Sequence, residues 1–277
     1  MTYEIKPLSG GLGVEVIGLD LAVSIDTETA EEINRAFVEN VVLVFRGQDI
    51  TVHQFLEAAK ILGDPMEQYL SQYKVPECPI VSYVSNQVKT DTGAPKLLGQ
   101  AWHTDQSFNP TPPKATMLHG VVLPKQGGNT CFANMRQAYE GLSDTLKARI
   151  DTLQAVHAYR ESREGLSAED RRAEEDSEDG VTHPVVRTLE EIGAKAIYIN
   201  PLRIKRFVGL SADESTSLLE ELTEHATRDR YVYCHPWQKG DIVIWDNRQS
   251  MHRVLHNYDL SEKRLMHRIV LEGSAPH

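Results

Sequence analysis

Residues 242–252 read IVIWDNRQSMH, a short apolar run followed by a turn-like Asp-Asn pair and then a histidine. Short runs rich in Val, Ile and Tyr and bounded by Gly, Pro or Asn are typical of β-strands. Such runs, mostly four to seven residues long, dominate this chain. The sequence therefore predicts strands at Tyr3–Ile5, Gly13–Ile17, Val41–Phe45, Ile80–Val84, Val185–Thr188, Ala196–Ile199, Tyr231–Cys234, Ile242–Trp245 and Leu265–Leu271.

Helices are fewer. Apolar residues recur at helical spacing over Thr27–Asn40. Capping-box patterns predict two more helices, over about 51–62 and 211–228, and Asn134–Asp151 predicts one or two others. Strands and helices do not alternate as in a βαβ fold, and no glycine-rich phosphate-binding motif is found. We therefore expect a mainly β fold, a sandwich or barrel flanked by helices.

The composition is that of an ordinary globular protein, with 277 residues, 40% hydrophobic and 25% charged. The net charge of −11 disfavours nucleic acid and anionic membranes as partners, because both require a basic surface. Nine acidic and three basic residues lie within 161–180, where Leu166 is the one large apolar residue. We expect this acidic excursion to be a mobile surface loop or a lid over a site.

The three cysteines, Cys78, Cys131 and Cys234, show no C-x-x-C spacing. An odd number without that spacing argues against a disulfide framework and favours a reducing cytoplasm. Met1–Leu8 lacks the basic and apolar regions of a signal peptide, and no apolar run approaches the roughly 18 residues of a membrane span. We therefore expect a cytoplasmic protein with no transmembrane segment.

The stretch Trp102-His103-Thr104-Asp105 is the most informative one for chemistry. Side chains two residues apart on an extended chain point to the same side, so His103 and Asp105 can reach one metal ion. His252 is the best third ligand. Two histidines and a carboxylate form the facial triad of non-haem Fe(II) oxygenases, which leaves positions open for a co-substrate and dioxygen. Zinc can use the same donors for hydrolysis, so the triad alone does not name the metal.

Arg264 and Arg268 lie four residues apart on an expected strand, and therefore on one face. Two guanidinium groups directed at one cavity repel each other unless anions lie there, and the planar fork of arginine suits a carboxylate. The pair thus suggests two anionic ligands near one metal. The alternative is a polar outer face on which both arginines form ion pairs.

Two further stretches accompany these motifs. Leu43-Val44-Phe45-Arg46-Gly47-Gln48 precedes the His103-x-Asp105 motif, and Gly127-Gly128-Asn129-Thr130 lies between that motif and His252. Together they resemble the taurine / 2,4-dichlorophenoxyacetate dioxygenase family of Fe(II)- and 2-oxoglutarate-dependent oxygenases, over nearly the whole chain. The resemblance implies a cupin-like double-stranded β-helix, or jelly roll, with helices buttressing one sheet. It also implies a single dioxygenase domain over residues 1–277.

By resemblance, His103, Asp105 and His252 are the iron ligands, and Arg264 and Thr130 bind the distal carboxylate of 2-oxoglutarate. The implied reaction uses dioxygen and hydroxylates a small anionic substrate, a carboxylate or sulfonate, with succinate and carbon dioxide as co-products. Related halogenases have a small residue in place of the carboxylate, so the aspartate favours hydroxylation. Homo-oligomers, dimers or tetramers, are also implied by the family.

The resemblance extends to the substrate pocket. Arg268 matches the position that grips the anionic group of the substrate, Phe108 matches an aromatic pocket residue, and Gln106 is a polar neighbour. Gln68 falls where taurine enzymes have a histidine, which disfavours taurine itself. Arg203 falls where they have an aromatic residue, so the substrate carries a second anionic or polar group if Arg203 faces the pocket, and Arg203 lies on the surface otherwise.

Two other functions fit fewer of these features. A zinc hydrolase with the same triad leaves Arg264 and Thr130 without a role. A catalytically silent metabolite-binding protein has no need for three intact ligands.

Overall fold

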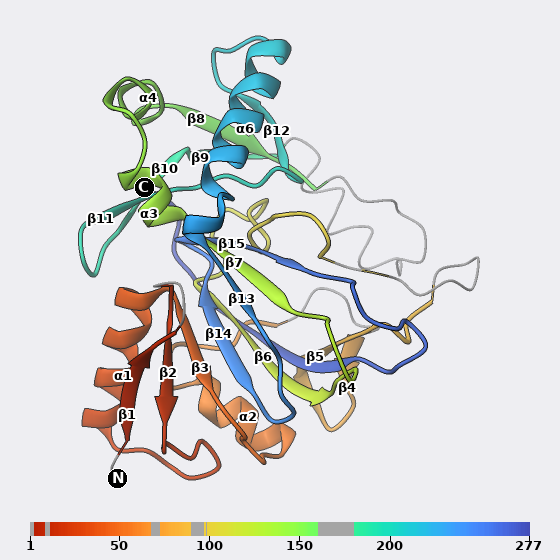
Figure 1. Cartoon of the computed structure of the whole chain (residues 1–277). Helices are drawn as coiled ribbons and strands as arrows, with labels where there is room; N and C mark the ends of the chain where they lie inside the picture. The colour runs from red at the N-terminus through yellow and green to blue at the C-terminus, as the bar shows by residue number, and fades with distance from the viewer. Residues whose placement is uncertain (1–2, 9–11, 68–72, 90–96, 98, 160–179) are drawn as a thin grey trace.

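The computed structural model describes residues 3–8, 12–67, 73–89, 97, 99–159 and 180–277. Its largest sheet has eight strands, which curve across the lower half of the molecule (Figure 1). In spatial order they are β1 (Glu4–Pro7), β2 (Val14–Ile17), β3 (Val42–Phe45), β14 (Ile242–Asp246), β6 (Ala115–Val122), β16 (Leu265–Leu271), β5 (Cys78–Ser85) and β4 (Lys74–Val75).

A second sheet has three strands, in the order β13 (Val232–His235), β7 (Thr130–Asn134) and β15 (Ser250–Val254). It faces the central strands of the large sheet. Phe132 of β7 and Tyr233 of β13 join Val44, Val243 and Trp245 of the large sheet in one buried cluster. This is a jelly roll, and the mainly β prediction is confirmed.

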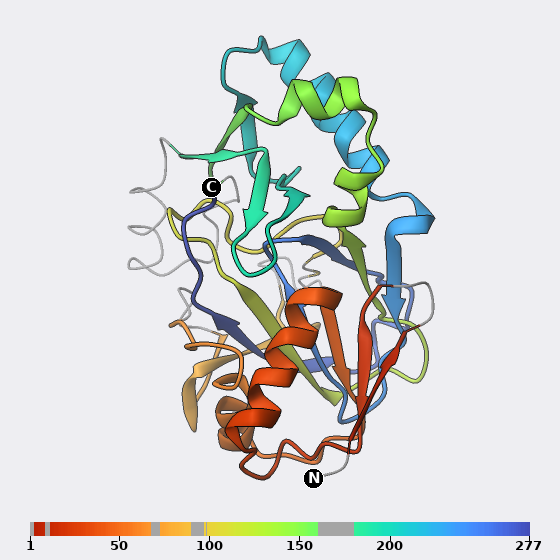
Figure 2. The ribbon, with the colours of Figure 1, turned by 90° about the vertical axis from the view of Figure 1, so that its left-hand side faces the viewer.

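Side-chain alternation explains how the large sheet is covered on both faces. On β3, Val42 and Val44 point inward to the second sheet, whereas Leu43 and Phe45 point outward. The outward side chains pack under α1 (Thr27–Asn40) and α2 (Val52–Ala59), which lie against this sheet in Figure 2. A strand buried on both faces reads as a continuous apolar run, as β3 does.

A separate lobe lies beyond the three-stranded sheet, in the upper half of Figure 1. It contains a third buried cluster, to which Ala138, Ile197, Phe207 and Leu222 contribute. Its elements are α3 (Met135–Glu140), α4 (Asp144–Ile150), β8 (Gln154–His157), β9 (Val181–Pro184), β10 (Val186–Leu189), β11 (Ala194–Ile197), β12 (Ile204–Phe207), α6 (Ala212–Ala226) and the short 3-10 helix Asp229–Tyr231. We call the described residues 135–159 and 180–231 the helical lobe.

The helix starts follow the sequence closely. Asp26 caps α1, and both predicted capping boxes form, at Thr51 with Gln54 and at Ser211 with Glu214. Within the described ranges, no helix is long and apolar enough to span a membrane.

The expectation about the cysteines is wrong in one respect, because Cys131 and Cys234 form a disulfide. The reason is strand register: β13 pairs antiparallel with β7, and this pairing sets Cys234 directly opposite Cys131 across 103 residues of sequence. Spacing along the chain does not reveal that register. Cys78 is a free, buried thiol. The acidic excursion at 161–180 lies almost entirely outside the described residues.

Candidate active site

The two predicted histidine ligands meet across a backbone pairing at the rim of the second sheet. The His103 N–H donates to the His252 carbonyl at 3.1 Å, and the His252 N–H donates to the His103 carbonyl at 2.8 Å. His252 belongs to β15, and His103 forms a single isolated antiparallel bridge to it at the edge of that sheet. The two rings lie with centroids 4.2 Å apart.

Asp105 completes the cluster predicted from the sequence. One potential ligand atom from each of His103, Asp105 and His252 lies within 4.8 Å of the others. In the part of the chain that the structure describes, this is the one group of three or more such residues close enough to hold a metal ion. Nε2 of His103 is 4.0 Å from Oδ1 of Asp105.

The protonation of these groups suits a divalent cation. Nδ1 of His103 lies 2.9 Å from the Ala101 carbonyl, which can only accept, so Nδ1 carries the proton and Nε2 keeps its lone pair. Burial lowers the pKa of His103. The pKa of His252 falls to about 3, mainly because the ring is buried and secondly because His103 lies next to it. Both imidazoles are therefore neutral at physiological pH, as metal ligands must be.

The carboxylate is charged for a different reason. Burial alone raises the pKa of Asp105, but the charge of Arg268, the two ligand histidines and the Thr116 hydroxyl together hold it well below its usual range. Nη2 of Arg268 lies 3.0 Å from Oδ2 of Asp105. The donor set is thus one anion and two neutral imidazoles, which fits Fe(II). Nδ1 of buried His252 has no hydrogen-bond partner among the described residues.

Arg264 is a buried cation directly before β16, the strand that carries Arg268. It is 4% exposed, and burial lowers its pKa to about 10. Its Nη2 donates to the Gly128 carbonyl at 3.2 Å, whereas its Nε has no partner and no carboxylate pairs with it among the described residues. A buried charge without a counterion is costly, so this guanidinium calls for an anionic ligand.

The glycine-rich stretch before Thr130 leaves room for that arginine. Gly128 adopts φ +71°, and a β-carbon there would lie 3.2 Å from Nε of Arg264. Thr130 follows at the start of β7, where its hydroxyl oxygen accepts from Nε1 of Trp237 at 3.0 Å. An indole N–H can only donate, so the Thr130 hydroxyl proton is directed elsewhere and is available to a ligand.

Three aromatic or cationic side chains gather beside the triad. The Phe108 and Tyr159 rings meet edge to face at 5.0 Å, and the Arg203 guanidinium lies 4.6 Å from the Tyr159 centroid and 5.7 Å from that of Phe108. The charge of Arg203 also contributes to the lowered pKa of His103, which places it near the ligands. Tyr159 cannot be predicted from the sequence, because an isolated tyrosine after a strand carries no recognisable signal.

Gln106 follows Asp105 in a left-handed conformation, with φ 45°, which is uncommon for a residue other than glycine. Its carbonyl accepts from the Asn109 N–H at 3.0 Å, and its side chain accepts from the Asn109 amide at 3.1 Å. This tight turn redirects the chain directly after Asp105. The predicted Gln68 lies outside the described residues.

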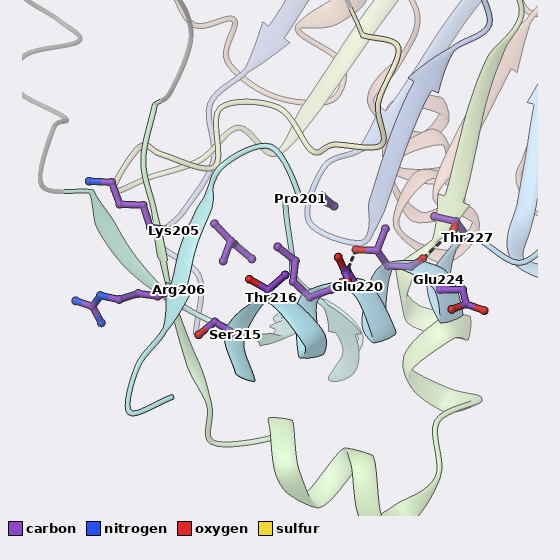
Figure 3. A pocket seen from close by; sticks show the side chains of 11 residues that line it. Pro201, Lys205, Arg206, Ser215, Thr216, Glu220, Glu224 and Thr227 are labelled. Atoms are coloured by element: carbon purple, nitrogen blue, oxygen red, sulfur yellow. Dashed lines mark hydrogen bonds between the residues drawn. The ribbon is translucent and has the colours of Figure 1, made fainter. Parts of the chain in front are cut away.

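The structure also has a groove on the helical lobe. A groove of about 610 Å³ runs between β12 and α6, with Lys205 and Arg206 on one side and Glu220 and Glu224 on the other (Figure 3). It contains none of the predicted site residues. The candidate active site is therefore the His103, Asp105 and His252 cluster, because its potential metal-binding atoms converge.

The fold and the site together define the class of the protein as a jelly-roll oxygenase with a two-histidine, one-carboxylate centre. A family model described as "Taurine catabolism dioxygenase TauD, TfdA family" matches residues 4–270, and the chain belongs to this family. The predicted family and the dioxygenase class are thus confirmed, and they do not fit the zinc hydrolase alternative.

Named relatives cover almost the whole chain. The sequence is 35% identical to an alpha-ketoglutarate-dependent 2,4-dichlorophenoxyacetate dioxygenase of Cupriavidus pinatubonensis over 97% of both chains. It is 32% identical to an alpha-ketoglutarate-dependent sulfate ester dioxygenase of Pseudomonas putida, over 100% of this chain and 91% of the relative.

Two solved structures superpose on almost the whole chain. A crystal structure of AAD-2 in complex with Mn(II) and N-oxalylglycine superposes with a TM-score of 0.83 at 34% identity, over 100% of this chain and 99% of the other. A taurine dioxygenase from Burkholderia xenovorans superposes with a TM-score of 0.85 at 31% identity, over 100% and 91%.

Proposed function

We propose that this protein is an Fe(II)- and 2-oxoglutarate-dependent dioxygenase that hydroxylates a small anionic substrate. The observation that carries the proposal is the pairing of a neutral-histidine, charged-aspartate cluster with Arg264, a buried cation that has no counterion among the described residues. The first suits a divalent iron, and the second suits the distal carboxylate of 2-oxoglutarate. The named relatives depend on the same co-substrate, called alpha-ketoglutarate in their names.

His103, Asp105 and His252 would hold the iron. When bound, the iron centre with 2-oxoglutarate and dioxygen supplies the oxidising power that converts a C–H bond to C–OH, with succinate and carbon dioxide as co-products. The protein's own contribution is positional and electrostatic. His103 keeps one nitrogen free because its other nitrogen is bound to the Ala101 carbonyl.

Arg264 and Thr130 would bind the far end of 2-oxoglutarate. The guanidinium offers a charged donor, and the hydroxyl of Thr130, whose oxygen already accepts from Trp237, offers a neutral one. Burial of this cation strengthens its pairing with a carboxylate, because little water competes.

The primary substrate would lie on the side of Arg268 and Arg203. Arg268 is partly exposed and contacts Asp105, so it can bind an anionic group close to the metal. Arg203, between Phe108 and Tyr159, would meet a second anionic or polar group or a planar ring. Gln106 and Gln68 are proposed as polar contacts of the same pocket. Relatives named for sulfate esters and for 2,4-dichlorophenoxyacetate act on anions of this kind.

We further propose that residues 1–277 work as a single dioxygenase domain in the cytoplasm, and as a dimer or tetramer. Neither nucleic acid nor a membrane is proposed as a partner, because the net charge is −11. Light scattering after size exclusion measures the oligomeric state.

The test is anaerobic binding of Fe(II) and 2-oxoglutarate, followed by visible absorption. A chelate of the two gives a weak charge-transfer band, which we expect in the wild type. Arg264→Met should lose the band at 2-oxoglutarate concentrations that saturate the wild type, and Arg264→Lys should retain part of it because the charge remains. An iron-loaded wild type without the band contradicts the proposal.

A further inference from the structure

A chain of buried hydrogen bonds ends on the carboxylate of Asp105. Thr116 of β6 donates from its hydroxyl to Oδ2 of Asp105 at 2.6 Å. The Asn247 amide donates to the Thr116 hydroxyl oxygen at 2.9 Å, and Nε1 of Trp245 donates to Oδ1 of Asn247 at 3.0 Å. Thr116, Asn247 and Trp245 are at most 2% exposed, so water does not compete for these bonds.

The direction of every proton in this chain is determined. An indole N–H can only donate, so the atom of Asn247 that faces Trp245 is the amide oxygen, and the amide nitrogen faces Thr116. That nitrogen can also only donate, so the Thr116 oxygen accepts there. A hydroxyl has one proton, and the proton of Thr116 is therefore committed to Asp105.

The backbone keeps the same groups in register. The Thr104 hydroxyl donates to the Asn247 carbonyl at 2.8 Å, and the Asn247 N–H donates to the Lys114 carbonyl at 2.9 Å. Thr104 stands between the two ligands of the His103-x-Asp105 motif. Trp245 also packs on His252, with ring centroids 4.6 Å apart.

The two oxygens of the Asp105 carboxylate are consequently in different surroundings. Oδ2 accepts from Thr116 and pairs with Arg268 at 3.0 Å, whereas Oδ1 is the oxygen 4.0 Å from Nε2 of His103. Two donors on Oδ2 resist rotation of the carboxylate about its Cβ–Cγ bond. Oδ1 is thereby left as the oxygen offered to a metal.

We infer that Thr116, oriented by Asn247 and Trp245, is a positioning residue that makes Asp105 a one-oxygen ligand. This inference rests on the proposed metal centre. A carboxylate that bound through both oxygens would take up one more coordination position. Thr116 thus preserves an open position of the facial triad.

The test compares Thr116→Val, which has nearly the same shape but no donor, with Thr116→Ser, which keeps the hydroxyl. Mn(II) binding is measured by calorimetry on the full metal-free protein, and Co(II)-loaded protein is measured by visible absorption, whose intensity depends on coordination number. Thr116→Val should weaken Mn(II) binding about tenfold, because outer hydrogen bonds of metal ligands typically contribute ten- to a hundredfold and Arg268 still holds Oδ2. Thr116→Val should also change the Co(II) spectrum. Thr116→Ser should keep the Mn(II) affinity and the Co(II) spectrum of the wild type.

Ser215→Ala is the matched control, because Ser215 is a buried hydroxyl in the helical lobe that accepts from the Phe207 N–H at 3.1 Å. It should lower the melting temperature and leave Mn(II) affinity unchanged. If Thr116→Val does not fold, Thr116→Ala removes the same donor. A wild type that binds no Mn(II) overturns the metal centre and this inference together. A wild type that binds, with Thr116→Val binding equally and giving the same Co(II) spectrum, overturns the positioning role alone.

Discussion

Replacing Arg264 by methionine should make the metal-free protein more stable, and replacing Arg248 in the same way should make it less stable. Both arginines are buried, at 4% and 6% exposure. They differ in their partners. Arg248 binds Asp246 at 2.8 Å and Glu191 at 2.7 Å, whereas Arg264 donates to a backbone carbonyl and has no carboxylate partner among the described residues.

The pKa of Arg264 gives the magnitude. Burial lowers it from 12.5 to about 10, and each pH unit corresponds to about 1.4 kcal/mol, so the charged form is disfavoured in the fold by about 3 kcal/mol. This cost applies at every pH below about 10, and it is relieved only as the pH rises from about 10 toward 12.5. Loss of the Gly128 hydrogen bond offsets about 1 kcal/mol.

Arg264→Met should therefore gain about 2 kcal/mol, or roughly 4–8 °C in melting temperature at about 2–4 °C per kcal/mol. Arg248→Met leaves the buried Asp246 without its bound cation, which should cost about 3–5 kcal/mol. Scanning calorimetry of the metal-free variants at pH 7.5 measures both. Addition of Mn(II) and 2-oxoglutarate should raise the melting temperature of the wild type more than that of Arg264→Met, because the variant lacks the cation that binds the co-substrate. The wild type should then be more stable than Arg264→Met. Equal destabilisation by the two substitutions would refute the reasoning, because it would mean that the fold compensates the Arg264 charge.

His103→Ala should abolish Mn(II) binding in calorimetry and all 2-oxoglutarate turnover; a variant that still turns over would disprove the ligand assignment. Gly128→Ala should weaken 2-oxoglutarate binding more than tenfold, because its β-carbon crowds Arg264 and the backbone is left-handed; an unchanged dissociation constant would contradict this. Arg268→Ala should raise the substrate requirement more than the 2-oxoglutarate requirement in steady-state kinetics, and the reverse pattern would remove it from the substrate site. Burial lowers the pKa of His157 to about 3, so stability should fall as pH drops from about 6.5 toward 3; His157→Gln should reduce that slope in urea titrations, and an identical slope would rule the contribution out.

The parts of the fold that the sequence could predict are those with local signals. The helix over Thr27–Asn40 and the strand over Leu265–Leu271 have the predicted bounds. The helix after Thr51 ends at Ala59, about three residues early, because the next amides bond three residues back and tighten the last turn. Strand β6, Ala115–Val122, has no clear signal in the sequence, because Thr116, His119 and Gly120 interrupt the apolar run that marks other strands buried on both faces.

In the candidate site, too, contacts between residues close in sequence could be predicted, whereas contacts between distant residues could not. His103 and Asp105 are two residues apart, so their geometry could be predicted from strand periodicity. The bond from Thr116 to Asp105 joins residues eleven apart across a turn, and the relay to Asn247 spans another 131. Such contacts depend on strand order and register, which a single sequence does not encode in any short pattern. The Cys131–Cys234 disulfide was missed for the same reason.

The helical lobe leaves the jelly roll after β7 and returns on β13, two strands that are hydrogen-bonded neighbours and are joined by the Cys131–Cys234 bond. The two ends of the lobe therefore lie side by side on the jelly roll. The residues proposed to bind iron and 2-oxoglutarate come from the jelly roll and its rim, whereas Tyr159 and Arg203, on the proposed substrate side, come from the lobe. If these assignments hold, changes in the lobe would alter the set of accepted substrates and leave the residues proposed for the oxidative chemistry in place.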